Sequence, residues 1–87
     1  MHMVVFEYTV SNPEGVHGRA AVDLVQCVSG LTSRVTVENG EKRAYANRLY
    51  DLLSLGARQG DHLRITVEGE NAPADALRLK SFYQAHI

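Results

Sequence analysis

Residues 4–30 of the chain read VVFEYTVSNPEGVHGRAAVDLVQCVSG, and their pattern of polar and apolar residues indicates a strand followed by a helix. Polarity alternates along the first seven of these residues, and this period of two predicts a strand with one inward face. That face carries the apolar residues Val4, Phe6, Tyr8 and Val10. The segment SNPEG at 11–15 is dense in turn-forming residues and should end the strand.

Beyond His17 the period changes from two to that of an amphipathic helix. Its inward positions recur at the spacing i, i+3, i+4, i+7 and are Ala21, Leu24, Val25 and Val28. We expect Ser29 and Gly30 to end this helix, with Gly30 as a left-handed cap.

The rest of the chain continues the same alternation of strands and helices. Two strands, at 33–38 and 41–46, flank Asn39-Gly40, which is a strong hairpin signal because both residues tolerate positive φ. A short helix at 48–54 follows, with Asn47 as its N-cap and Gly56 as its stop. A fourth strand is built on Leu63, Ile65 and Val67.

Pro73 lies near the start of a last helix, where a missing N–H costs least. Its inner face should carry Ala76, Leu79 and Tyr83. The element order is therefore β-α-β-β-α-β-α. A sheet with helices on one face is the economical way to bury these apolar stripes, so we expect an α+β fold.

Composition limits the function classes. The 87 residues, 45% of them apolar, suit one domain over 1–87 with a modest core. A net charge of -1 argues against a nucleic-acid binder. We also find no apolar run near the ~20 residues of a membrane span and no signal peptide, so we expect a cytoplasmic protein without membrane insertion. The single Cys27 fits a reducing compartment.

The segment GVHGRAA at 15–21 carries the chemistry, because His17 stands where a turn becomes a helix. The first N–H groups of a helix lack internal partners, and the helix dipole adds partial positive charge. An anion is stabilised there, while the charged imidazolium is disfavoured, so we expect a neutral, nucleophilic His17. Arg19 can add a charge-assisted contact to a phosphoryl oxygen, and Gly18 lets another chain approach closely.

Most histidines just before a helix are caps or surface residues, so this pattern alone leaves the role of His17 open. His2, His62 and His86 are best interpreted as solvated surface groups. No two histidines have a ligand-like spacing within one element, so we expect no metal site. We expect no cofactor either.

The short helix carries more apolar residues than one buried face of two turns can hold. We assign Leu52 and Leu55 to the core. Leu49, Tyr50 and Leu53 share one side, and we expect them to form an exposed patch of the kind that marks a protein interface.

The sequence resembles the HPr family, the histidine phosphocarriers of the bacterial sugar phosphotransferase system (PTS). GVHGRAA resembles the family's Gly-(Leu/Ile)-His-x-Arg-Pro-Ala motif, and LYDLLSLGARQG at 49–60 resembles its second signature. The element order also matches the family's open-faced sandwich, a four-stranded antiparallel sheet with three helices on one face. The resemblance covers nearly the whole chain.

The resemblance implies a monomeric phosphoryl carrier that is not an enzyme. His17 would be phosphorylated on Nδ1, Arg19 would be the active-site arginine, and the backbone of Gly18 and Arg19 would cradle the phosphate. The donor would be enzyme I with phosphoenolpyruvate, and the acceptors would be EIIA domains or their regulatory relatives. Leu49, Tyr50 and Leu53 would lie where the family docks its partners. We also expect Arg48 to bind partners, as part of a charged rim around this patch.

Three departures from the family pattern keep an alternative open, a regulatory binding module with this fold outside sugar transport. Ala20 replaces the motif proline, so the entry turn loses rigidity. Arg48 stands where many relatives have a regulatory serine, so we expect no control by HPr kinase. Gln26 and Ser29 replace frequent lysines, and Arg48 and Arg58 could partly replace that charge.

Overall fold

The computed structural model describes residues 2–87, which form four strands and three helices. In chain order these are β1 (His2–Thr9), α1 (Arg19–Ser29), β2 (Arg34–Asn39), β3 (Lys42–Tyr45), α2 (Leu49–Ser54), β4 (His62–Gly69) and α3 (Ala72–His86). Both the expected order and the α+β class are confirmed.

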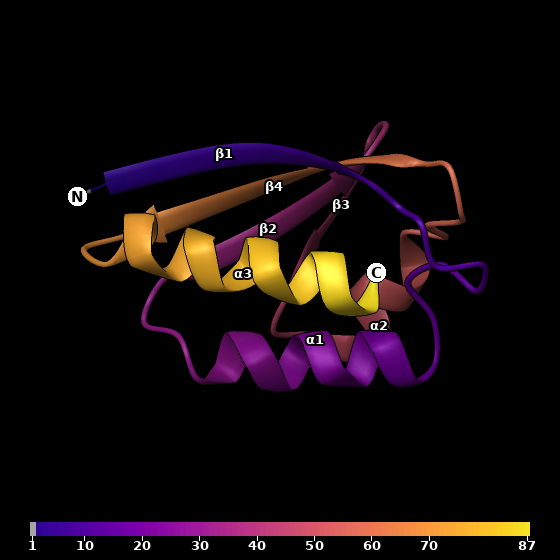
Figure 1. Ribbon diagram of the computed structural model, residues 1–87, viewed down its shortest axis with the longest axis horizontal. Helices are drawn as coiled ribbons and strands as arrows, with labels where there is room; N and C mark the ends of the chain where they lie inside the picture. Colours follow the sequence, from indigo (N-terminus) through magenta and orange to yellow (C-terminus); the bar gives the residue numbers. More distant parts are fainter. Residues whose placement is uncertain (1) are drawn as a thin grey trace.

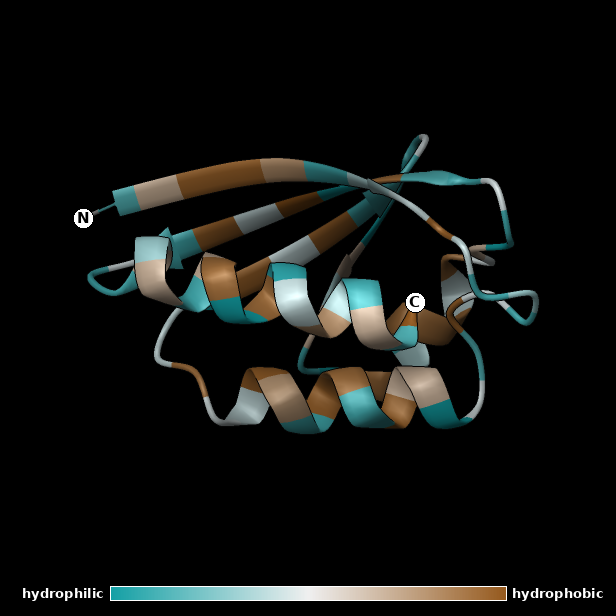
Figure 2. Ribbon diagram, viewed as in Figure 1, coloured by the Kyte–Doolittle hydropathy of each residue, from teal (hydrophilic) through white to brown (hydrophobic). Residues whose placement is uncertain are grey.

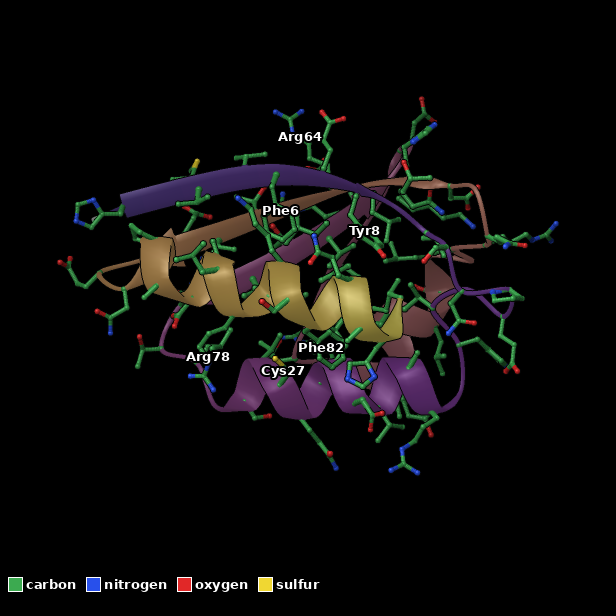
Figure 3. All side chains as sticks on the ribbon, viewed as in Figure 1. Phe6, Tyr8, Cys27, Arg64, Arg78 and Phe82 are labelled. Carbon is green, nitrogen blue, oxygen red and sulfur yellow. The ribbon has the colours of Figure 1, made fainter. Side chains whose placement is uncertain are left out.

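The four strands make one antiparallel sheet in the order β1-β4-β2-β3 (Figure 1). β4 is therefore inserted between β1 and β2, and it pairs with β1 along its whole length, from Thr9 opposite His62 to His2 opposite Gly69. All three helices lie on the same face of the sheet, so the opposite face is open (Figure 1). Arg64 extends from that open face, away from the helices (Figure 3).

The core lies between the sheet and the helices and follows the two sequence periods. Apolar residues alternate along the strands and recur along one side of α1 (Figure 2). On α1, Ala21, Leu24 and Val28 are buried, while Val25 is half-buried. The inward positions expected on α3, namely Ala76, Leu79 and Tyr83, are also buried. Burial of this continuous apolar layer is the main driving force for the fold.

Tyr83 is the largest fully buried side chain. Its ring packs edge-on against Phe6, Tyr8 and Phe82, at centroid distances of 6.0, 5.4 and 6.3 Å. Phe6 and Tyr8 point from β1 towards α3 (Figure 3). Burial raises the pKa of the Tyr83 phenol well above its ordinary value, and the nearby Cys27 thiol adds to that rise. Tyr83 therefore fastens α3 to the sheet as a neutral side chain.

Three expected turn details are wrong. Gly30 has φ -85, because the chain continues in the right-handed sense after α1 and needs no left-handed residue. The hairpin loop is Gly40-Glu41, since Asn39 still pairs with Lys42, and the amide of Asn39 instead donates to the Leu55 carbonyl at 3.1 Å. Arg48, rather than Asn47, precedes the first residue of α2, and no side chain caps that helix.

Candidate functional site

The turn before His17 is held in place by close backbone contacts. Gly15 has φ +69 and lies so near the loop after α2 that a Cβ atom there would overlap the Ala57 carbonyl oxygen. The N–H of Val16 donates to that same oxygen at 3.1 Å, and the Val16 side chain is 3% exposed. The residue just before the histidine is thus fixed in the core.

The end of α3 supports the same turn from its other side. The N–H groups of Ser11 and Asn12 both donate to the Ile87 carbonyl, at 2.8 and 2.7 Å. The Asn12 amide also donates to the His86 carbonyl at 3.0 Å. Segments far apart in the sequence therefore meet beneath the turn that presents His17.

His17 itself is exposed, directly after the buried Val16. Gly18 precedes α1 with φ 52 and ψ -123, a conformation that only glycine adopts readily. The carbonyls of His17 and Gly18 accept from the N–H groups of Ala20 and Val22, each at 3.2 Å. The backbone thus turns into the helix while the imidazole remains accessible to another protein.

The N–H groups of Gly18 and Arg19 have no hydrogen-bond partner within residues 2–87. They belong to the first turn of an 11-residue helix, where the dipole is positive. An oxyanion attached to His17 would meet these two amides, which are the backbone groups that the sequence predicts as its cradle.

Arg19 is not directed at His17 in this structure. Its side chain is 87% exposed, and Nε donates to Oδ1 of Asp23 at 3.0 Å, one helical turn further on. Asp23 was not among the site residues predicted from the sequence. The sequence does indicate this ion pair, because residues four apart in a helix are neighbours and Arg19 and Asp23 carry opposite charges.

Asp61 stabilises the loop that carries Ala57. Its carboxylate accepts from the Arg58 N–H at 3.0 Å and from the Asn39 amide at 3.2 Å, and in that order these two bonds lower the pKa of Asp61. A carboxyl with a lowered pKa contributes stability above its unfolded pKa, and the contribution is lost as pH falls through the folded value. The contribution of Asp61 to this loop is therefore lost as the solution becomes acidic.

The surface of α2 differs from the expected patch. Tyr50 is 84% exposed, as expected. Leu49 and Leu53 are only half-buried and pack against the core, because α2 is pressed between α1 and β3. Leu52 and Leu55 are buried, which confirms their assignment. Arg48 is exposed and stacks its guanidinium 5.3 Å from the centre of the Tyr45 ring. The apolar surface offered here therefore consists mainly of one tyrosine.

A groove of about 700 Å³ lies between the end of α1 and the β3–α2 connection. Arg34, Tyr45, Asn47 and Arg48 line it, but His17 and Arg19 do not. The exposed His17 thus lies outside this groove. No helix within residues 2–87 has the length and apolar character needed to cross a membrane.

Comparison with known proteins places this geometry in a known group. The family model for the "PTS HPr component phosphorylation site" matches residues 4–85, which include the whole turn from Gly15 to Arg19. The chain is 37% identical over 76 residues to a multiphosphoryl transfer protein of Xanthomonas campestris, covering 87% of this chain and 9% of that protein. It therefore spans only a small part of that relative.

Two further similarities cover nearly whole proteins. The chain is 33% identical over 69 residues to a phosphocarrier protein HPr of Xylella fastidiosa, covering 79% of this chain and 78% of that protein. The crystal structure of a phosphocarrier protein HPr from Bacillus anthracis superposes with a TM-score of 0.87 at 27% identity, over 94% of this chain and 98% of that chain. Sequence and fold therefore agree over the same elements.

Proposed function

Because the chain belongs to the HPr family of phosphocarriers, we propose that His17 takes a phosphoryl group from enzyme I and passes it to EIIA-type domains. As a member of this family the chain is a phosphocarrier and not an enzyme. Phosphoenolpyruvate supplies the phosphoryl group through enzyme I. We place the relay in the cytoplasm. We expect residues 1–87 to form one domain and to act as a monomer.

One observation carries the proposal. His17 is exposed at the start of α1, close in sequence to the cationic Arg19 and to two backbone N–H groups that have no partner among residues 2–87. In the transfer, Nδ1 of His17 attacks phosphorus, the new N–P bond forms, and the bond from phosphorus to the donor breaks. The donor's leaving atom keeps the electron pair of that bond. The added negative charge then lies near the amides of Gly18 and Arg19, which stabilise it.

The same observation favours relay over a purely regulatory binding module. A docking module has no need of an exposed imidazole at the positive end of a helix. The substitutions at Ala20 and Arg48 leave this arrangement intact, since Ala20 is a buried residue within α1 and Arg48 lies at the start of α2. Because Arg48 has no hydroxyl, it cannot accept the phosphate of a serine kinase.

Incubation with enzyme I and phosphoenolpyruvate, followed by intact mass measurement, tests the proposal. We expect the mass to rise by one phosphoryl group and to return to its starting value after mild acid treatment, because phosphohistidine is acid-labile. A mass that stays unchanged while a known HPr is phosphorylated in the same mixture would overturn the proposal.

Replacing Arg19 by Ala should slow phosphorylation by about tenfold and leave the melting temperature nearly unchanged. One charge-assisted hydrogen bond to a phosphoryl oxygen contributes about 1.5 kcal/mol, which is about tenfold in rate. The exposed ion pair with Asp23 adds at most about 1 kcal/mol to folding. Stopped-time phosphorylation assays and thermal melts measure the two effects. A variant that unfolds, yet transfers normally per folded molecule, would show that Arg19 is structural.

Replacing Tyr50 by Ala should weaken binding to enzyme I by about tenfold, because exposed aromatic residues often dominate the energy of such interfaces. Its stability should change by less than about 0.5 kcal/mol. Leu49 and Leu53 are less suitable positions, since they are half-buried and their loss would also destabilise the core. The matched control is Leu77→Ala on α3, which removes a side chain that is 66% exposed. Equal affinities for the two variants would remove α2 from the docking surface.

A further inference from the structure

We propose that Asp23 is a positioning residue that holds Arg19 away from His17 until the phosphoryl group arrives. The inference rests on the proposed function and assigns a regulatory part of the same site. Asp23 would act only through Arg19, by competing with the phosphoryl group for the guanidinium. It would thereby set how tightly the carrier keeps its phosphate.

The geometry places the carboxylate on the opposite side of Arg19 from His17 along the chain. Arg19 is the first residue of α1, His17 lies before the helix, and Asp23 lies one turn into it. The bond from Arg19 Nε to Asp23 Oδ1, at 3.0 Å, draws the guanidinium along the helix and away from its N-terminal end. The Asp23 side chain is 25% exposed, whereas that of Arg19 is 87% exposed.

The ion pair between Arg19 and Asp23 is weak. Its cation precedes its anion in the helix, which is the less favourable orientation for an i,i+4 pair. Arg19 also stands at the positive end of the helix dipole. Since the guanidinium is largely exposed, solvent and salt screen the attraction to Asp23. A phosphoryl group on His17 carries more negative charge than one carboxylate and can therefore bind the Arg19 guanidinium in place of Asp23.

This competition for Arg19 predicts the direction in which Asp23 shifts the phosphorylation equilibrium. The Nε–H of Arg19 is bonded to Asp23, so the phosphoryl group can accept from that N–H only when the bond to Asp23 breaks. The Asp23 carboxylate therefore raises the free energy of the phosphorylated form relative to the unphosphorylated form. This favours transfer of the phosphoryl group to an acceptor. Neutralising Asp23 should shift the equilibrium towards the phosphorylated form.

The experiment is an exchange between wild-type protein and the Asp23→Asn variant, with a catalytic amount of phosphorylated enzyme I. Isotopic labelling of the wild-type protein separates the two masses, and the equilibrium constant is read from their phosphorylated fractions. We expect about a twofold preference for phosphate on the variant, as befits an exposed i,i+4 ion pair. The preference should fall towards one at high salt.

Two comparisons separate positioning from simple charge. Glu14→Gln removes an exposed carboxylate three residues before His17 that is not paired with Arg19, and it should show a smaller preference. In an Arg19→Ala background the effect of Asp23→Asn should disappear. A ratio of one or below for Asp23→Asn, or an unchanged ratio without Arg19, would overturn the inference.

The test also distinguishes failure of this inference from failure of the proposed function. If enzyme I does not phosphorylate the wild-type protein, the relay proposal fails. The same variants are then loaded with phosphoramidate, a small chemical donor, and the loss of phosphate from His17 is timed. Slower loss from the Asp23→Asn variant, dependent on Arg19, would still support the positioning role, and equal rates would contradict it.

Discussion

Replacement of His17 by Ala should abolish phosphorylation by enzyme I and phosphoenolpyruvate. His17 is the histidine just before α1, and in the proposed relay its exposed imidazole is the nucleophile, a role that the backbone amides and Arg19 cannot fill. The fold should be unaffected, because the His17 side chain makes no hydrogen bond to any of the described residues. Radiolabel incorporation and a thermal melt measure the two outcomes.

The matched control is His62→Ala, which removes an exposed histidine on β4 whose Nδ1 lies 2.8 Å from Thr9 Oγ1. This variant should accept phosphate at the wild-type level. Persistent labelling of the His17→Ala protein would move the phosphorylation site to another residue. Loss of labelling in both variants would show that the assay reports folding instead.

Replacement of Gly15 by Ala should cause the largest loss of stability. The added Cβ would overlap the Ala57 carbonyl oxygen, and φ +69 is unfavourable for any residue with a side chain. Backbone strain and overpacking together cost about 2–5 kcal/mol, which lowers the melting temperature of a domain this size by about 10–30 °C. Phosphorylation should fall as well, because the same contact positions Val16 and His17.

Gly40→Ala provides the control for backbone strain alone. Gly40 has φ +63, but a Cβ there would meet nothing within 4 Å. The expected loss is therefore only about 1 kcal/mol, with normal phosphorylation per folded molecule. Calorimetric melts of the two variants give the comparison. Similar losses of stability at the two glycines would mean that the contact with Ala57 does not hold the turn.

The fold was predictable because its elements follow two clear periods. Alternation in β1 and β4 and the helical spacing in α1 each reflect one buried face, and burial is what the sequence encodes most directly. The turn details were less predictable, because they depend on distant partners. Asn39 is the clearest case, since its amide bonds to Leu55 and Asp61 instead of shaping the hairpin loop.

The candidate site likewise combines local features that the sequence predicts with long-range contacts that it does not predict. The motif predicts His17, Gly18 and Arg19 as site residues, because the three are consecutive in the sequence just before a helix and at its start. The contact of Gly15 with Ala57 joins residues far apart in the chain, so local reasoning could not find it. The half-burial of Leu49 and Leu53 likewise depends on how closely α1 and β3 approach α2.

A two-step transfer experiment determines whether this chain relays a phosphoryl group. The chain is loaded with enzyme I and phosphoenolpyruvate, separated from both, and mixed with an EIIA-type domain while the masses of the two proteins are followed. We predict that the phosphoryl group leaves this chain and appears on the acceptor in equal amount. A chain that takes no phosphate, or one that loses it only to water while the acceptor stays unmodified, would show that the chain is not a relay.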